Sequence, residues 1–168
     1  MLITDKFVFI HFPRAGGTFV YDVVKKFFPS AFEFGYHLPR ELLPKEFAHL
    51  PILGTIRNPW DFYVSWFQHQ NSNVNYTLKK NVLFGVLSDD RKLNLVQTIQ
   101  NALDIGVNIT KLNSLIQALP ETYDFQERNI PNLTKGLMER VRGRAIGLYT
   151  FRFNQLFGHA DDVHFCRI

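Results

Sequence analysis

The residues best suited to chemistry lie in a glycine-rich turn, FPRAGGT, at residues 12–18. The turn follows an apolar run and precedes an amphipathic one, so it joins a predicted strand to a predicted helix. Gly16 and Gly17 let the backbone approach a ligand closely, and the N–H groups of a helix N-terminus attract anions. Arg14 adds positive charge, and Thr18 adds a hydroxyl donor that can also cap the helix. The turn therefore predicts a phosphate or sulfate site, with a tight turn that binds nothing as the alternative.

A second candidate site begins at Arg57, where another predicted strand ends and a predicted helix begins. Asn58 suits the N-cap position and Pro59 the first helical position. Ser65 lies two turns into that helix. Ligands of parallel α/β sheets bind at the carboxyl ends of strands, so Arg57 and Ser65 could hold a second phosphate. The alternative is a capped helix beside a solvated arginine.

The two segments lack the signatures of the commonest nucleotide sites. A P-loop of the Walker A type needs a lysine directly after its last glycine, whereas Thr18 follows Gly17. The spacing GxGxxG of dinucleotide folds is also absent. The six histidines form no HExxH pattern, so we expect no bound metal.

Taken together, FIHFPRAGGT at residues 9–18 and IRNPWDFYVS at residues 56–65 resemble a known family. They are similar to the two cofactor-binding segments of sulfotransferases that use 3′-phosphoadenylyl sulfate (PAPS). The resemblance implies a P-loop-like fold that transfers a sulfuryl group from PAPS and releases 3′,5′-ADP, without a metal. It implies that the 5′-phosphosulfate contacts Arg14, Ala15, Gly16, Gly17, Thr18 and Phe19, and that the 3′-phosphate contacts Arg57 and Ser65.

The chain departs from the family pattern in three places. Many members have Lys where Arg14 stands, and Ser or Thr where Phe19 stands, so Phe19 can offer only its backbone N–H. Residues 163–168 resemble a later core strand of the family. Members usually continue into a basic, glycine-containing loop that completes the cofactor site, so the resemblance implies that this chain is either truncated at its C-terminus or a degenerate member.

A sulfotransferase also needs a base that takes the proton from the acceptor hydroxyl. His37 is the first candidate, because it follows a predicted strand and has a near-neutral ordinary pKa. The resemblance places the base of several carbohydrate sulfotransferases after the same strand. Glu33 and Glu41 are the alternatives, while His11, directly before the turn, is expected to orient it.

The elements that must position these residues follow from hydrophobic periodicity. We expect strands at 6–11, 32–37, 51–57 and 163–168, the last of them buried, and a broken helix at 38–48. We expect helices at 18–28, from 59 to about 70, and at 92–103, 109–119, 132–141 and 145–157. Strands that alternate with helices indicate a parallel sheet. The predicted fold is a three-layer α/β/α single domain over residues 1–168, with a helical insertion at about 74–160.

Composition narrows the class of protein. The chain has 168 residues, a net charge of +4, one cysteine and no long apolar stretch. The charge is too small and too evenly spread to predict a nucleic-acid partner. A single cysteine excludes an internal disulfide framework. With no visible signal peptide or membrane span, we expect a cytoplasmic location.

The sequence therefore predicts a PAPS-dependent sulfotransferase that acts on a hydroxyl of a small molecule or a carbohydrate. A non-catalytic module that binds 3′,5′-ADP or another nucleotide is the first alternative. A phosphotransferase similar to nucleotide kinases is the second, although the missing Gly-Lys-Ser/Thr run speaks against it.

Overall fold

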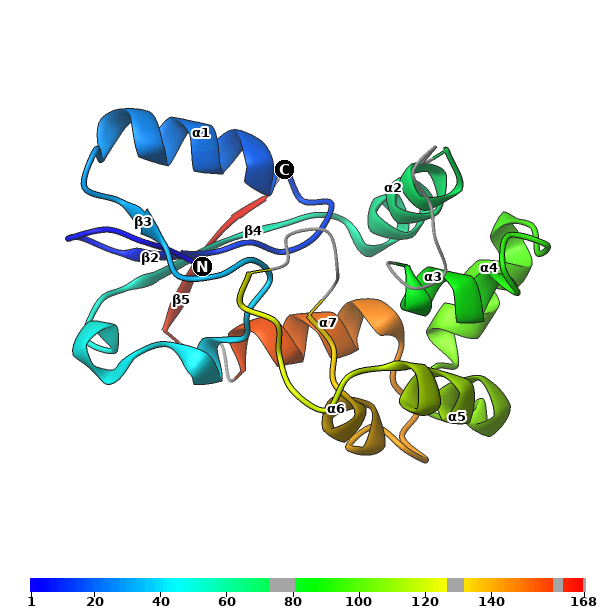
Figure 1. Ribbon diagram of the computed structural model, residues 1–168. Coiled ribbons are helices and arrows are strands. Elements are labelled where there is room, and N and C mark those ends of the chain that lie inside the picture. Colours follow the sequence, from blue (N-terminus) through cyan, green and yellow to red (C-terminus); the bar gives the residue numbers. More distant parts are fainter. Residues whose placement is uncertain (73–80, 127–131, 159–161, 168) are drawn as a thin grey trace. The chain divides into compact units, whose positions relative to one another are not determined.

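The computed structural model describes residues 1–72, 81–126, 132–158 and 162–167 (Figure 1). The chain has a mixed α/β fold and divides into two compact units, each described here by itself. The sheet unit contains residues 1–58, 125–126 and the described residues from 152 onward. The helical unit contains residues 59–124 and 132–151.

A five-stranded sheet forms the centre of the sheet unit. Its strands are β1 (Leu2–Ile3), β2 (Val8–Ile10), β3 (Phe32–Glu33), β4 (Ile52–Ile56) and β5 (Val163–Arg167), in the order β3-β1-β2-β4-β5. The β2–β4 and β4–β5 pairs are parallel, whereas β1 runs antiparallel to both β2 and β3. The prediction of a parallel sheet was therefore wrong, because the two-residue strand β1 was not foreseen.

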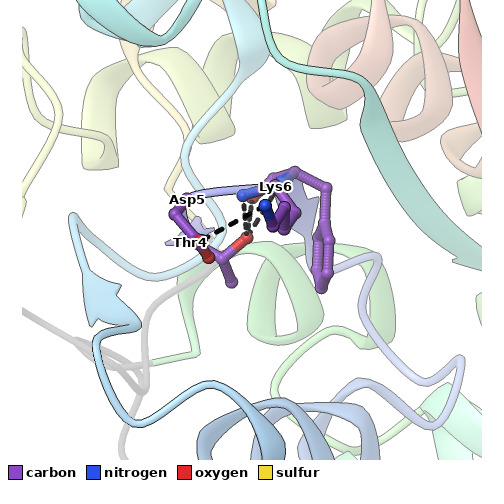
Figure 2. A network of polar contacts seen from close by, with 4 residues as sticks. Thr4, Asp5 and Lys6 are labelled. Atoms are coloured by element: carbon purple, nitrogen blue, oxygen red, sulfur yellow. Dashed lines mark hydrogen bonds and ion pairs between the residues drawn. The ribbon is translucent and has the colours of Figure 1, made fainter.

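The antiparallel pairing follows from the tight turn that joins β1 to β2. Within it, the Thr4 hydroxyl donates to the Phe7 carbonyl at 2.8 Å and accepts from the Lys6 and Phe7 amides at 3.1 and 2.9 Å (Figure 2). The Thr4 amide also donates to the Phe7 carbonyl at 3.0 Å. A turn this short can connect only antiparallel strands. Asp5 and Lys6 form an exposed ion pair at 3.7 Å, which stabilises the turn little.

Helices cover both faces of this sheet. On one face lies α1 (Gly17–Phe27) (Figure 1). Its Tyr21 and Val24 pack against Leu2 and Phe9 of the sheet. On the other, Phe157 at the end of α7 (Leu148–Phe157) lies over Gly54 of β4. A Cβ at Gly54 would lie 2.6 Å from the Phe157 ring, so the glycine makes room for the aromatic side chain. The predicted α/β class is confirmed, with α1 on one face of the sheet and the end of α7 on the other.

Two boundaries near the turn differ from prediction. Gly16 is the N-cap of α1, with φ 65°, so Thr18 lies inside the helix rather than capping it. The predicted strand at 32–37 ends at Glu33, and His37 adopts a left-handed φ of 53°. The broken helix predicted at 38–48 is present as two 3₁₀ turns, Arg40–Leu42 and Lys45–Phe47.

The last strand is less buried than predicted. β5 lies at the edge of the sheet, where His164, Cys166 and Arg167 are exposed. An edge strand has a neighbour on one side only, and its apolar residues do not show which strand it will pair with. Arg40 and Asp162 form a bidentate ion pair directly before β5.

The helical unit contains helices predicted from periodicity, with starts set by capping residues. It comprises α2 (Pro59–Ser72), α3 (Val82–Ser88), α4 (Leu95–Leu103), α5 (Ile109–Ala118), α6 (Lys135–Glu139) and the first turn of α7. The helices predicted from 92 and 132 start three residues later, because Asn94 and Thr134 accept hydrogen bonds from backbone amides and act as N-caps. The helix predicted from 145 begins at Leu148.

The boundary of the predicted insertion also differs. The insertion was predicted at about 74–160, whereas the helical unit already begins at Pro59 and residues 152–158 belong to the sheet unit. Parts of the predicted insertion, at 74–80, 127–131 and 159–160, lie outside the described residues. Among the described helices, none combines the length and apolar character needed to cross a membrane.

Candidate functional site

The glycine-rich turn lies at the carboxyl end of β2, directly before α1. Arg14 and Gly16 both have left-handed backbones, with φ of 60° and 65°. These two residues reverse the chain so that an eleven-residue helix can begin at Gly17. The first amide groups of a helix have no partner within it and form the positive end of its dipole. A left-handed arginine is rare and strained, which is typical of functional sites.

Arg57 follows β4, the parallel neighbour of β2, and reaches the same turn. Its Nη1 donates to the Arg14 carbonyl oxygen at 3.4 Å. Burial and the nearby charge of Arg57 lower the pKa of the Arg14 guanidinium. Two guanidinium groups that repel each other at a helix N-terminus are stabilised by an anion. The structure therefore brings Arg14 and Arg57, one from each motif, close together at the start of α1.

His11 explains why residue 17 is a glycine. A Cβ at Gly17 would lie 1.8 Å from Cδ2 and 2.2 Å from Nε2 of the His11 ring. The imidazole is 5% exposed and fills the space that a side chain at residue 17 would occupy. His11 therefore contacts the start of α1, as expected for a residue that orients the turn. Gly17 has a packing role that the sequence did not reveal.

His37 lies beside His11 in a group of aromatic rings. Its ring centroid is 4.7 Å from that of His11 and 4.2 Å from that of Tyr36. The residue as a whole is partly exposed, but both ring nitrogens are buried and have no hydrogen-bond partner among the described residues. The Nδ1 atom of His11 is buried in the same way.

Both imidazoles are neutral at pH 7. Burial, the Met1 amino group and Arg14 lower the pKa of His11 to about 4. The pKa of His37 lies well below its ordinary value, because of burial first and then of the charges on His11, Arg152 and Met1. A neutral imidazole can accept a proton, so His37 meets one requirement for a base.

The two alternative bases lie in different surroundings. Glu33 forms an ion pair at 3.9 Å with Lys25, which lies in the last turn of α1, at the opposite end from the glycine-rich turn. Glu41 is exposed in the first 3₁₀ turn. These positions favour His37 over Glu33, whose carboxylate is held away from the turn.

The remaining predicted site residues are distributed as follows. Ala15 is buried, Thr18 is exposed, and the Phe19 side chain is 71% exposed. Thr18 and Phe19 thus leave their side chains outside the core at the start of α1. Ser65 is half-buried in α2 of the helical unit, so its pairing with Arg57 of the sheet unit stays a prediction.

Sequence analysis missed Arg152, a buried arginine of α7 that is 2% exposed. Its Nη1 donates to Oε1 of Gln155, and its charge lowers the pKa of His37. The signal in the sequence was an arginine between Phe151 and Phe153 in an otherwise apolar part of a helix. Such a residue is buried only when its surroundings satisfy it.

The described residues contain no group of three or more His, Cys, Asp or Glu side chains arranged to hold a metal ion. Comparisons of the chain with protein-family models, with curated proteins and with solved structures found no match.

Proposed function

We propose that this protein is a PAPS-dependent sulfotransferase that acts on a hydroxyl acceptor, with a carbohydrate as one candidate class. The observation that carries the proposal is the approach of Arg57 to Arg14 at the N-terminus of α1. A helix N-terminus with two guanidinium groups suits a ligand with more than one anionic group. The family resemblance of the same two segments favours PAPS over other dianions.

The residues of the turn fit the phosphosulfate end of this ligand. Arg14, the Thr18 hydroxyl and the backbone amides of Gly17 to Phe19 would hold the 5′-phosphosulfate. Arg57, together with Ser65, would hold the 3′-phosphate. Burial and the charge of Arg57 both lower the pKa of Arg14, and a bound anion would offset the repulsion between the two cations. When bound, PAPS supplies the sulfuryl group and 3′,5′-ADP as the leaving group.

The chain's own residues then have three tasks. The turn binds and orients the donor, Arg14 neutralises charge that develops near the sulfuryl group, and His37 accepts the proton of the acceptor hydroxyl. Because the pKa of His37 is well below its ordinary value, the base is active at lower pH than a solvated histidine would be. The rate should therefore reach its plateau below about pH 6.5.

Calorimetry with two nucleotides tests the phosphate assignment. The wild-type chain should bind 3′,5′-ADP roughly tenfold to a hundredfold more tightly than 5′-AMP, as a second charge-assisted phosphate contact provides. Arg57→Ala should abolish the difference. Arg140→Ala, which removes an exposed arginine of the helical unit, is the matched control and should preserve it. Equal affinities in the wild type would reject the proposed function.

Arg14→Ala separates binding from transfer. Arg14 would face the sulfuryl group, which 3′,5′-ADP lacks, so this variant should lose much more transfer activity than product affinity. Arg57→Ala should weaken both. The opposite pattern would exchange the two phosphate sites.

A non-catalytic nucleotide-binding module is the second candidate, and one observation favours it. Both ring nitrogens of His37 are buried, whereas a base must contact its substrate. Tight binding of 3′,5′-ADP without sulfuryl transfer from PAPS to any of a broad panel of hydroxyl acceptors would select this candidate.

A further inference from the structure

The two histidines beneath the turn present an unusual set of buried polar atoms. Three imidazole nitrogens have no partner among the described residues: Nδ1 of His11 and both nitrogens of His37. A neutral imidazole carries one N–H donor and one lone-pair acceptor. A buried donor or acceptor without a partner destabilises a protein, so such atoms are usually paired in a working state.

The surroundings of His11 determine which of its nitrogens can accept. Nε2 lies against Gly17 at the start of α1 and is not among the unpartnered atoms, whereas Nδ1 is. In the tautomer with its proton on Nε2, the lone pair of His11 is on Nδ1, inside the group of rings. The charged groups that act on His37 besides His11 are Arg152 and the Met1 amino group. The Arg152 guanidinium is a donor only, so it cannot accept a proton from a His37 N–H. The Met1 amino group, whose pKa burial lowers to about 5, donates to the Gly35 carbonyl.

The ring positions make contact between the two histidines feasible. Their centroids are 4.7 Å apart and their planes are inclined by 43°. A hydrogen bond between two imidazoles separates their centroids by about 5 Å, given an N···N distance near 3 Å. Forming it requires the rings to turn about χ2, a torsion that is broad for histidine.

We propose that His11 is a positioning residue for His37: its Nδ1 accepts a hydrogen bond from one His37 N–H and so fixes the tautomer of that ring. The bond pairs two of the three orphaned nitrogens and leaves a single lone pair on His37. That the lone pair then takes the proton of an acceptor hydroxyl rests on the proposed function. The hydrogen bond itself does not depend on it.

NMR of the full chain with ¹⁵N-labelled histidine tests the hydrogen bond without any substrate. Long-range ¹H–¹⁵N correlations at pH 7 should show His11 protonated on Nε2 and His37 in one dominant tautomer. His11→Phe keeps a flat ring but removes the acceptor, and His37 should then populate both tautomers. His11→Asn, whose amide oxygen can stand near the Nδ1 position, should restore one tautomer. His164→Phe, on the exposed edge strand, is the control and should change nothing.

Two results would overturn the proposal: a mixture of tautomers at His37 in the wild type, or an unchanged single tautomer in His11→Phe. If His11→Phe does not fold, the wild-type spectrum and the His11→Asn variant still test the hydrogen bond between His11 and His37. In turnover assays, His11→Phe should lower kcat about tenfold to a hundredfold, the range seen when a positioning partner is removed.

The proposed function and the positioning role of His11 can be rejected separately. A wild-type chain that does not bind 3′,5′-ADP rejects the proposed function whatever the tautomer result. Binding and transfer in the wild type, combined with a His37 tautomer that ignores His11, reject only the positioning role.

Discussion

The two units of this chain differ in the hydrogen bonding of their buried polar groups. In the helical unit, the Tyr63 hydroxyl accepts from the Tyr149 amide at 3.1 Å. Asn132 both accepts from and donates to the backbone of Asp124, at 2.9 Å each. The Thr98 hydroxyl and Oε1 of Gln70 are exceptions, since both are buried without a hydrogen-bond partner among the described residues.

In the sheet unit, atoms without partners gather at one place. His11 Nδ1, both nitrogens of His37 and Thr55 Oγ1 are buried and unpaired among the described residues. The parallel register pairs Ile10 with Gly54, so the next residues along, His11 and Thr55, are neighbours at the carboxyl ends of β2 and β4. Structural regions satisfy their polar groups, whereas binding sites leave some for a ligand. The contrast supports a site beneath the turn.

Of the variants proposed here, Gly17→Ala should lower the unfolding free energy the most. The new Cβ would overlap the buried His11 ring, so we expect a loss of about 3 kcal/mol or more of unfolding free energy, at the upper end for an overpacked core. The matched control is Gly136→Ala in α6, where nothing lies within 4 Å. Alanine there should stabilise the helix by roughly 0.5–1 kcal/mol. Denaturation curves measure both variants.

A double variant tests whether the His11 ring causes the expected destabilisation by Gly17→Ala. His11→Ala removes the ring that the new Cβ meets, so adding it to Gly17→Ala should destabilise the chain less than the sum of the two single changes. Strict additivity would show that the His11 ring is not what excludes a side chain at residue 17.

Acid should destabilise the sheet unit through its histidines. The unfolded chain binds a proton at His11 below about pH 6.5, but the folded chain does so only near its pKa of about 4. Stability is therefore complete above about pH 6.5 and is lost as the pH falls toward 4, by about 3 kcal/mol for this residue. His37 acts in the same direction.

Urea denaturation at pH 7, 5.5 and 4 measures this loss. Both tryptophans, Trp60 and Trp66, lie in the helical unit, so their fluorescence reports only on that unit. Hydrogen exchange followed by mass spectrometry is therefore needed to assign the loss of stability to one unit. The His11→Phe variant should lose less stability with acid than the His164→Phe control. An identical pH dependence in the two variants would contradict the buried neutral state of His11.

Asn132→Ala should have an intermediate effect, confined to the helical unit. The change removes two hydrogen bonds to the Asp124 backbone from a residue that is 3% exposed. We expect a loss of about 1–2 kcal/mol, detectable by tryptophan fluorescence during denaturation. No loss would show that water replaces the asparagine.

Thr55→Val should change the unfolding free energy the least, and should raise it instead of lowering it. The hydroxyl is buried without a partner, and valine keeps the shape while removing the unsatisfied group. We expect a change of less than about 1 kcal/mol, toward greater stability. A clear destabilisation would indicate that Thr55 is hydrogen-bonded in solution, and the contrast between the units would be weaker.

Local signals in the sequence determined much of the fold. Apolar periodicity predicted α1, α2, α4, α5 and the strands β2 and β4, because each pattern depends only on neighbours along the chain. The cap residues Asn94 and Thr134 were visible in the sequence but were not used, and they set the helix starts. The glycine-rich turn and Arg57 were found because their residue types and spacing carry the chemistry.

Tertiary structure decided the rest, because these features depend on contacts between distant residues. The antiparallel strand β1 is two residues long and gains its stability from pairing on both sides. The glycine at residue 17 is required by the ring of His11, and the left-handed His37 is held beside that ring by packing. The neutral state of both imidazoles comes from burial and from cations on other elements, which no local pattern records.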